Sequence, residues 1–351
     1  MTDLLALTEE LCAIPSVSGD EAALADDIES RLRGTAPKLD VERLGANVVA
    51  RTETGAAKRV VLGGHLDTVP ANNNLSPRRE GDVLHGLGTA DMKGGLAVLL
   101  ELARRASEQS PRYDVTLVFY EGEEVADEHN GLRKLFEQRR DLVAADLAVL
   151  LEPTAGWVEA GCQGTIHVRA TFDGARAHSA RPWMGVNAIH RAAPLLQRIA
   201  NFEPAVVDVD GLEYRESLQI VRIDGGIANN VVPDACSVVV NRRYAPNREL
   251  ADAIAEVEAL CAGADHIEVL NASVAAPPNL WQPLVAELIG VYDLPVRPKL
   301  GWTDVARFAA HGVAALNLGP GDPELAHTPA ERVDRGDLDG CAAVLAAFLG
   351  L

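Results

Sequence analysis

The sequence predicts an α/β protein in which a mostly parallel sheet, covered by helices, is interrupted by a smaller inserted domain. In residues 1–163 and 276–351, short β-branched apolar runs alternate with segments of helical spacing, which is typical of a parallel sheet buried on both faces. In residues 164–275 the expected order is β-α-β-β-α-β, that of a ferredoxin-like unit. We therefore expect one α/β domain formed by the outer segments and an inserted domain between them.

The outer segments begin with two helices and then alternate between strands and helices. Apolar residues recur at helical spacing over 4–14 and 21–33, and Ser18 to Asp20 offer side chains that can cap the second helix. Later apolar runs predict strands over 59–64, 115–120, 146–151 and 313–318, and helices over 93–106, 281–291, 305–311 and 338–349.

The inserted segment begins at Gly164, where strands start to alternate polar and apolar residues as in half-buried sheets. Its expected elements are strands over 166–172, 218–223, 237–244 and 267–270, and helices over 186–199 and 249–260. A break over 275–278 ends the unit, and elements of the first kind then resume.

Charge and composition exclude several classes of protein. The chain has 351 residues, with 32 Lys and Arg against 51 Asp and Glu, which gives a net charge of −19. Nonspecific nucleic-acid binding requires a cationic surface, so we expect no nucleic-acid partner. With 48% apolar and 24% charged residues, the composition is that of a globular protein and not of a disordered or fibrous chain.

Three observations bear on location. No segment has the length of a membrane span. Residues 1–15 lack a basic start, and Glu9 and Glu10 interrupt their apolar run, which favours an amphipathic helix over a signal peptide. The five cysteines form no C-x-x-C pair, which argues against a disulfide framework or a cysteine zinc site. We therefore expect a cytoplasmic protein that contacts no membrane.

His65 and Asp67 follow the predicted strand at 59–64, at the end of the sheet where open α/β sheets bind ligands. In a His-x-Asp pair on extended backbone, both side chains project from the same face, so Asp67 can orient a metal-bound His65. Taken alone, the tripeptide is more typical of a solvated loop histidine beside a capping aspartate.

Two further carboxylates stand next to predicted elements. Asp91, within Gly88 to Gly95, comes directly before a predicted helix, where an N-cap is enough to explain it. The glycine pair at 94–95 lowers helix propensity and indicates close backbone packing. Glu152 ends the strand at 146–151.

A third group of carboxylates is Glu121-Gly122-Glu123-Glu124, which follows the strand at 115–120. Three carboxylates in four residues repel one another unless cations compensate them. A charged surface turn is an equally good interpretation of this motif alone.

Each of these motifs is weak singly, but together they form a donor set for metal ions. The five side chains are His65, Asp91, Glu124, Glu152 and His327. Two histidines with three carboxylates and no cysteine suit a pair of divalent ions, and one carboxylate can bridge such ions at about 3.5–4 Å. Glu123 then remains as a proton shuttle.

These motifs resemble those of a known family, the co-catalytic di-zinc deacylases and exopeptidases that include aminoacylase, acetylornithine deacetylase, carboxypeptidase G-type enzymes and succinyl-diaminopimelate desuccinylase. The resemblance rests on Gly64 to Pro70, Gly88 to Gly95, Glu121 to Glu124, Glu152-Pro153-Thr154 and His327, and it extends over essentially the whole chain. It implies a catalytic domain of the zinc-exopeptidase type with an inserted lid, an amidohydrolase activity, and two Zn²⁺ per chain for which Co²⁺ can substitute.

The resemblance also implies the roles of individual residues. It places His65 and Glu152 on one zinc ion, Glu124 and His327 on the other, and Asp91 between both. Asp67 would orient His65, and Glu123 would be the general base. A cis peptide bond is implied between Asp91 and Met92.

For the inserted domain, the resemblance implies a lid through which two chains form a homodimer. The family's histidine that corresponds to His178 reaches the active site of the partner subunit and stabilises the oxyanion. Positions that resemble the family's substrate contacts are Asn230, Arg243, Thr303 and Arg307. Arg242 can exchange roles with Arg243, and the register of Thr303 and Asp304 stays open because the family's Thr-Ser-Asp-Gly-Arg motif is altered here.

The zinc ligands do not distinguish the activities of the family, since acetylornithine-type deacetylases and dipeptidases share them. Segments 187–190, 214–216, 301–304 and 319–322 are most similar to the desuccinylases of lysine and diaminopimelate biosynthesis. This implies hydrolysis of a small N-acyl amino acid, N-succinyl-L,L-diaminopimelate, to succinate and L,L-diaminopimelate. Its three carboxylates match the charge of Arg176, Arg181, Arg243 and Arg307. A non-catalytic binding module predicts loss of a metal ligand, whereas all five are present.

Overall fold

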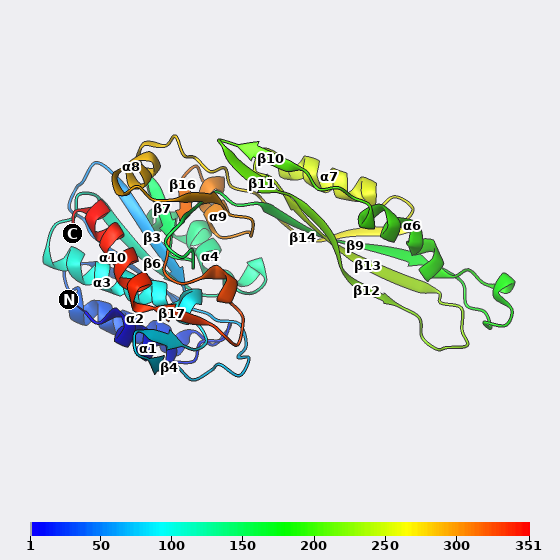
Figure 1. Ribbon diagram of the computed structural model, residues 1–351, viewed down its shortest axis with the longest axis horizontal. Coiled ribbons are helices and arrows are strands. Elements are labelled where there is room, and N and C mark those ends of the chain that lie inside the picture. Colours follow the sequence, from blue (N-terminus) through cyan, green and yellow to red (C-terminus); the bar gives the residue numbers. More distant parts are fainter. Residues whose placement is uncertain (1) are drawn as a thin grey trace. The chain divides into compact units, whose positions relative to one another are not determined.

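The computed structural model describes residues 2–351, which form two compact units (Figure 1). The first unit contains the chain up to Ala160 together with Asn279–Arg297 and Arg307–Leu351, and the second contains Gly161–Pro278 and Pro298–Ala306. The second unit is called the lid below. The sequence analysis assigned all of 276–351 to the larger domain. In the structure, Pro298–Ala306 belongs to the lid, because the carbonyl of Lys299 accepts the N–H of Gln163 and the indole N–H of Trp302 donates to the carbonyl of Val274.

An eight-stranded sheet forms the centre of the first unit. Its strands are β1 (Asp40–Leu44), β2 (Asn47–Arg51), β3 (Arg59–His65), β6 (Asp114–Tyr120), β7 (Leu147–Leu150), β8 (Val158–Ala160), β15 (Val296–Pro298) and β16 (Ala314–Asn317). They follow one another in the order β1-β2-β6-β3-β7-β16-β8-β15. The neighbours β6, β3, β7 and β16 run parallel, while β2 is antiparallel to β6 and β8 to β16. The predicted parallel sheet is confirmed at its centre, and antiparallel strands extend it on both sides.

Helices cover this sheet. They are α1 (Leu4–Cys12), α2 (Ala22–Thr35), α3 (Gly94–Glu108), α4 (Gly131–Gln138), α5 (Arg140–Val143), α8 (Pro283–Tyr292), α9 (Val305–Ala310) and α10 (Arg335–Leu349). Helix α3 packs against β3 and β6, and α1, α2 and α10 pack around it (Figure 1). Short helical turns lie at Thr89–Lys93, Asp127–His129 and Pro323–Leu325. A separate small sheet has the order β17-β5-β4, formed by β4 (Arg78–Glu80), β5 (Val83–His85) and β17 (Arg332–Asp334).

The glycine pair at the start of α3 brings that helix close to the sheet. A Cβ atom at Gly95 would lie 2.6 Å from the carbonyl oxygen of Leu151, directly after β7. The expected close backbone packing is confirmed, because only glycine leaves room for this approach. Helix α3 therefore begins beside the carboxyl ends of the central strands.

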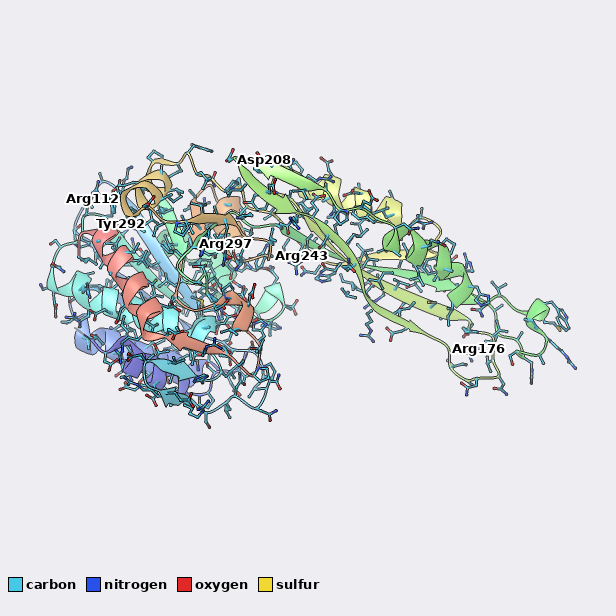
Figure 2. The ribbon with its side chains drawn as sticks, viewed as in Figure 1. Arg112, Arg176, Asp208, Arg243, Tyr292 and Arg297 are labelled. Carbon is cyan, nitrogen blue, oxygen red and sulfur yellow. The ribbon has the colours of Figure 1, made fainter. Side chains whose placement is uncertain are left out.

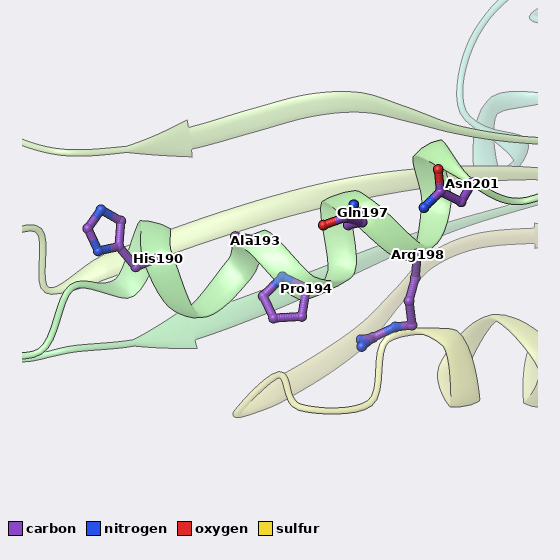
Figure 3. Close-up of a pocket in the computed structure, with 6 residues that line it drawn as sticks. All are labelled: His190, Ala193, Pro194, Gln197, Arg198 and Asn201. Atoms are coloured by element: carbon purple, nitrogen blue, oxygen red, sulfur yellow. The ribbon is translucent and has the colours of Figure 1, made fainter.

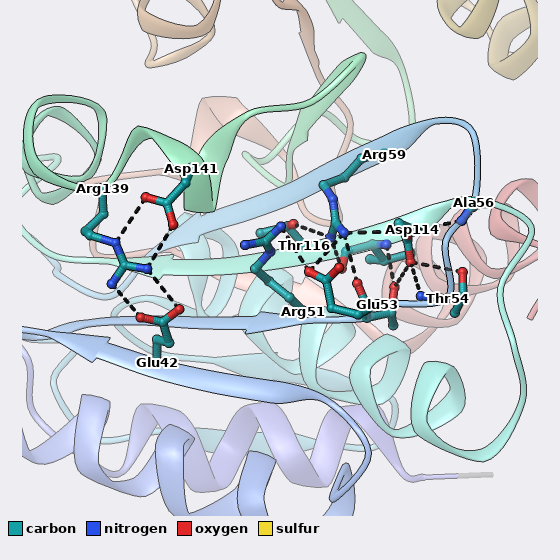
Figure 4. Close-up of polar contacts among 12 residues, drawn as sticks. Glu42, Arg51, Glu53, Thr54, Ala56, Arg59, Asp114, Thr116, Arg139 and Asp141 are labelled. Carbon is teal, nitrogen blue, oxygen red and sulfur yellow. Dashed lines mark hydrogen bonds and ion pairs between the residues drawn. The ribbon is translucent and has the colours of Figure 1, made fainter.

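A buried aspartate anchors the connection between β2 and β3. Asp114, at the start of β6, accepts hydrogen bonds from the hydroxyl of Thr52, from the hydroxyl and N–H of Thr54, and from the N–H of Ala56 (Figure 4). Figure 4 also shows the ion pairs of Arg139 with Glu42 and Asp141. The hydrogen bonds of Asp114 fix the segment that leads into β3.

The lid has the ferredoxin-like order that the sequence predicts. Its main elements are β9 (Gly164–Asp173), α6 (Ala188–Ala200), β12 (Ser217–Gly225), β13 (Ala235–Tyr244), α7 (Leu250–Leu260) and β14 (His266–Ser273), with a short helical turn at Pro182–Met184. The sheet order is β12-β13-β9-β14, and all three neighbouring pairs are antiparallel. A hairpin of β10 (Val206–Val209) and β11 (Leu212–Arg215) is added between α6 and β12.

Both ends of the lid segment lie side by side. Cys162 pairs with Ala276 just outside the sheet, and Thr165 pairs with Ser273 within it. An insertion with adjacent ends leaves the continuity of its host domain intact.

One predicted cap is wrong. Helix α2 has Glu21 as its N-cap, without a side-chain hydrogen bond, and the hydroxyl of Ser18 donates to Asp67 instead. Ser18 pairs at long range because its segment lies beside residue 68, to whose carbonyl its N–H donates. Among residues 2–351, no helix combines the length and the apolar character needed to cross a membrane.

Candidate metal centre

Four parallel strands bring candidate side chains to one edge of the main sheet. Strand β3 ends at His65, and the segments after β6, β7 and β16 carry Glu123 and Glu124, Glu152 and His327. Because β6, β3, β7 and β16 are neighbours that run in the same direction, their carboxyl ends meet at this edge.

Asp91 lies between the two histidines. Its Oδ1 is 3.0 Å from His65 Nε2, and its Oδ2 is 3.3 Å from His327 Nε2. His327 Nε2 is also 2.7 Å from Glu124 Oε1. A carboxylate whose two oxygens face two different imidazoles has the geometry of a bridge between two cations. Asp91 does not cap α3, whose N-cap is Lys93, and the peptide bond between Asp91 and Met92 is cis, as the resemblance implies.

Donor atoms of these residues gather in groups of three, within 4.8 Å of one another. One group is His65, Asp91 and Glu152, and another is Asp91, Glu124 and His327, so Asp91 belongs to both. Imidazole and carboxylate donors suit divalent ions, and carboxylates this close together need positive charge between them. The residues present therefore fit two metal ions that share Asp91.

The electrostatics of these side chains agree with this fit. Hydrogen bonds with Asp91 and Glu124 raise the pKa of His327 to about 10. Burial opposes protonation of His65, but its contacts with Asp67 and Asp91 outweigh burial and raise the pKa of His65 well above its ordinary value. Burial likewise opposes ionisation of Asp91, yet His327 and His65 hold the pKa of this carboxyl below its usual range. These shifts show that the carboxylates of the cluster stabilise positive charge on their neighbours, and divalent ions would supply such charge.

Asp67 connects His65 to the loop that carries the two glutamates. The carbonyl oxygen of Asp67 is 2.9 Å from His65 Nδ1. Its carboxylate accepts the N–H groups of Glu123 and Glu124, each at 3.0 Å, and the hydroxyl of Ser18 at 2.7 Å. Burial opposes ionisation of Asp67, but contacts with His65 and Ser18 and the loop N–H groups lower its pKa to about 2. The backbone carbonyl of Asp67 thus orients the imidazole of His65, while its buried carboxylate holds the glutamate loop.

Glu123 and Glu124 differ in their surroundings. Glu124 contacts His327, while a third group of donor atoms consists of His65, Glu123 and Glu124. Glu123 therefore lies at the same edge as the candidate ligands. Its position suits either a metal ligand or a proton acceptor.

His178 and Asn230 lie on two adjacent exposed loops of the lid. The N–H of Ser179 donates to the carbonyl of Asn230 at 2.9 Å, and His178 Nδ1 accepts the N–H of Ala180 at 3.0 Å. The loops are held together by their backbones, which leaves the carboxamide of Asn230 exposed.

Arg242 and Arg243 face opposite sides of β13. Arg242 is fully buried and pairs with Glu216 at 2.7 Å and with Glu256 at 3.1 Å. It also donates to the carbonyl of Arg243 at 2.8 Å. Arg243 is only partly buried, so it is the one of the two whose guanidinium is accessible to a ligand.

The other predicted substrate residues have contrasting surroundings. In the lid, Thr303 and Asp304 are both buried, so exposure does not separate the two possible registers. In the first unit, Arg307 pairs with Asp127 at 2.7 Å, and Asp127 also pairs with Arg133. A substrate carboxylate that binds Arg307 would therefore compete with the carboxylate of Asp127.

The arginines of the lid do not form a single cluster. Figure 2 shows Arg176 and Arg243 towards opposite ends of the lid. Arg176 is paired with Asp234 at 2.6 Å. A surface pocket of about 700 Å³ lies along α6 (Figure 3) and is lined by His190, Ala193, Pro194, Gln197, Arg198 and Asn201. None of the predicted site residues lines it.

Two residues that the sequence analysis did not select support the centre. Ser18 hydrogen-bonds to Asp67, and Glu331 accepts the N–H groups of Ala90 and Asp91. The position of Glu331, four residues after His327, is the only signal in the sequence that could have drawn attention to it.

The fold and the donor set are those of a metal-dependent hydrolase with two ions. Residues 61–350 match the family described as Peptidase family M20/M25/M40, and the chain belongs to this family. The family resemblance inferred from the motifs is confirmed, and so is the expectation of a hydrolase.

Two relatives show one particular kind of enzyme in this family to which the chain is similar. The "Putative succinyl-diaminopimelate desuccinylase DapE" of Mycobacterium tuberculosis (strain H37Rv) is 48% identical over 349 residues, which covers 99% of this chain and 98% of the relative. The "Succinyl-diaminopimelate desuccinylase" of Corynebacterium glutamicum is 46% identical over 354 residues, with 99% and 96% covered.

Solved structures share the fold over nearly the whole chain. A tripeptidase from Staphylococcus aureus superposes with a TM-score of 0.81 at 23% identity and covers 99% of this chain and 96% of its own. The YXEP protein of Bacillus subtilis, described as a dinuclear metal binding peptidase, has a TM-score of 0.70 at 15% identity, with 99% and 96% covered.

Proposed function

We propose that this chain hydrolyses the amide bond of N-succinyl-L,L-diaminopimelate to succinate and L,L-diaminopimelate, with two metal ions bound at the edge of the main sheet. The observation that carries the proposal is the placement of Asp91, whose two oxygens each face a different histidine. The substrate follows from the names of two relatives that are 46–48% identical over almost the full chain.

The ligand assignment follows the groups of donor atoms. His65 and Glu152 would hold one ion and Glu124 and His327 the other, and Asp91, which belongs to both groups of donor atoms, would be shared. We propose zinc as the metal, with cobalt as a substitute, because mixed imidazole and carboxylate donors suit both. Two bound zinc ions would lower the pKa of a water towards neutrality and polarise the amide carbonyl.

The protein's own groups would then move the protons. Glu123 takes a proton from the water and passes it to the leaving amine, while Asp67 keeps His65 oriented through Nδ1. A hydrogen bond from His178 would stabilise the oxyanion that forms on the carbonyl. The two adjacent glutamates thus have different roles: Glu123 shuttles protons, and Glu124 binds metal.

The substrate's carboxylates require positive charge and hydrogen-bond donors. We assign this role to Asn230, Arg243, Thr303 and Arg307. Arg243 is supported by its accessibility beside the buried Arg242, and guanidinium groups bind carboxylates in bidentate fashion.

We further propose a homodimer built through the lid. The two edge strands of its sheet expose apolar side chains, among them Val221 and Ile223 on β12 and Ile267 and Val269 on β14. Exposed edges with apolar side chains favour association with another chain. A reducing, cytoplasmic location is supported by five free cysteines that are all buried.

The test is a comparison of substrates with the purified zinc-loaded protein. N-succinyl-L,L-diaminopimelate should be hydrolysed with a kcat/KM roughly a thousandfold above that of acetylornithine, because charged donors left unpaired by the smaller substrate cost several kcal/mol. Equal or better turnover of acetylornithine or of a dipeptide would overturn the substrate and leave the two-metal hydrolase intact.

A pair of lid variants locates the specificity. Arg243→Ala should reduce the preference for the succinyl substrate more than it reduces the reaction with acetylated amino acids. Arg198→Ala is the matched control, because Arg198 is an exposed lid arginine that lies on α6 and not on an edge strand, and its guanidinium donates to the carbonyls of Leu260 and Ala262. Similar losses on both substrate classes for Arg243→Ala would remove Arg243 from substrate recognition.

A further inference from the structure

A buried carboxylate outside the ligand set contacts the backbone of the shared ligand. Glu331 is 1% exposed, and its Oε1 accepts the N–H groups of Ala90 and Asp91, each at 3.1 Å. The two segments are 240 residues apart in the sequence. Burying a carboxylate is unfavourable unless hydrogen bonds compensate it, and these two N–H groups supply such bonds for Glu331.

The turn that carries Asp91 lacks a regular backbone pattern. Asp91 and Met92 have non-helical φ and ψ angles between Gly88 and the start of α3. The N–H groups of Ala90 and Asp91 both point to the same oxygen of Glu331. Buried N–H groups need acceptors, and this carboxylate supplies one for both.

The segment around Glu331 also carries His327 and is itself fixed to the same part of the chain. The carbonyl of Glu331 accepts the N–H of Gly86 at 3.0 Å, and the following strand β17 pairs with β5. Upstream, the carbonyl of Thr328 accepts the side-chain N–H of Asn74 at 3.1 Å. Glu331 therefore connects the backbone that presents one histidine to the backbone that presents Asp91.

We propose that Glu331 is a positioning residue for both metal sites: by accepting the N–H groups of Ala90 and Asp91, it holds the shared carboxylate in register with His327. The proposal rests on the ligand roles assigned to Asp91 and His327 above. Glu331 itself binds no metal, since it acts through the backbone of Asp91. Groups that orient metal ligands typically contribute about 10–100-fold to metal affinity.

The experiment measures metal affinity in the full-length chain by competition with a chromogenic chelator, with zinc and cobalt as probes. Glu331→Ala should weaken binding at both sites by about 10–100-fold and change the visible absorption spectrum of the cobalt-loaded protein. Glu331→Gln keeps an oxygen that can accept both N–H groups, so it should recover most of the affinity and the wild-type spectrum.

Two further variants separate the possible causes. Leu345→Ala removes a buried side chain of α10, a helix that carries none of the proposed ligands, and should lower stability, so its metal affinity should match wild type well below its melting temperature. If Glu331→Ala does not fold, Glu331→Asp, which is one methylene too short to reach both N–H groups, takes its place and should show the same loss.

The outcomes are distinct. Wild-type affinity in Glu331→Ala, or a loss in Glu331→Gln as large as that in Glu331→Ala, would overturn the positioning role. Retention of both ions by Asp91→Ala would instead overturn the proposed ligand set. Loss of both ions in Asp91→Ala together with unchanged binding in Glu331→Ala would refute the positioning role alone.

Discussion

Asp67 and Asp91 are chemically identical side chains that contact the same histidine on opposite sides of its ring. Asp91 faces Nε2 of His65 and also reaches His327, so it can bridge two ions. Asp67 lies on the Nδ1 side, where its carboxylate is occupied by the glutamate loop and Ser18. What each aspartate can do is decided by which groups surround its oxygens, because an oxygen saturated by N–H and O–H donors has little capacity left for a metal.

Glu123→Gln separates the chemistry from the metal site. The change keeps the size of the side chain and removes its basicity, so kcat should fall by about 10² or more while metal content stays near two ions. Elemental analysis and steady-state kinetics on the same preparation measure both quantities.

Glu124→Gln is the matched variant for this prediction. It should lose metal, because the carboxylate of Glu124 stands 2.7 Å from His327 Nε2 within one of the donor groups. If Glu123→Gln loses an ion but keeps its turnover per bound zinc, the roles of the two glutamates are reversed.

Among the elements, α3 shows how a helix combines packing with charge. Its first turn approaches the sheet through Gly95, and its middle buries the carboxylate of Glu101. Glu101 accepts hydrogen bonds from Arg104 and Arg105 one turn later and from the hydroxyl of Thr2. The helix therefore tolerates a buried acid because local cations neutralise it.

Glu101→Gln should remove a pH-dependent part of the stability. Burial opposes ionisation of Glu101, but its hydrogen bonds with Arg104, Thr2 and Arg105 lower its pKa from 4.5 to about 2. A lowered carboxyl pKa stabilises the folded chain above the unfolded-state pKa, and this contribution is lost as the pH falls from about 4.5 towards 2. Urea unfolding should show a difference of about 1–2 kcal/mol between wild type and variant at pH 7 that shrinks markedly at pH 3.

Glu108→Gln serves as the control for this measurement. Glu108 also pairs with Arg104, but its side chain is 62% exposed, so its removal should change the free energy of unfolding by less than about 0.5 kcal/mol at either pH. A difference for Glu101→Gln that stays constant between pH 7 and pH 3 would show that packing, and not the charge, accounts for its effect.

For the whole molecule, the main question is whether one chain contains a complete site. His178 belongs to the lid, whereas all five proposed metal ligands belong to the other unit. If a homodimer supplies His178 from the partner, mixing inactive His178→Ala chains with inactive Glu123→Ala chains should restore part of the activity, because one hybrid site is then intact.

The mixing experiment also requires a measure of how far the two kinds of chain exchange between dimers. Differently tagged chains, isolated by two successive affinity steps, show that mixed dimers have formed. Absence of recovery in such dimers would place His178 in the site of its own chain or outside the reaction.

Much of the fold was predictable because its signals are local. Continuous apolar runs identified β3, β6 and β7, and alternation identified the lid strands, since burial on one face or on two imposes those patterns directly. Short strands such as β1, β15 and β17 were missed, because three to five residues of mixed polarity form no recognisable period and pair only when a neighbour is present.

Residue types at short spacing were enough to predict the central strands, to select the candidate metal ligands and to recognise the family. Three features required the folded chain: which oxygen of Asp91 faces which histidine, the burial of Arg242 beside the more accessible Arg243, and the contacts of Ser18 with Asp67 and of Glu331 with the backbone of Asp91. These contacts join residues up to 240 positions apart. No local pattern encodes such distances, because they arise only when packing of the apolar strands and helices brings remote segments together.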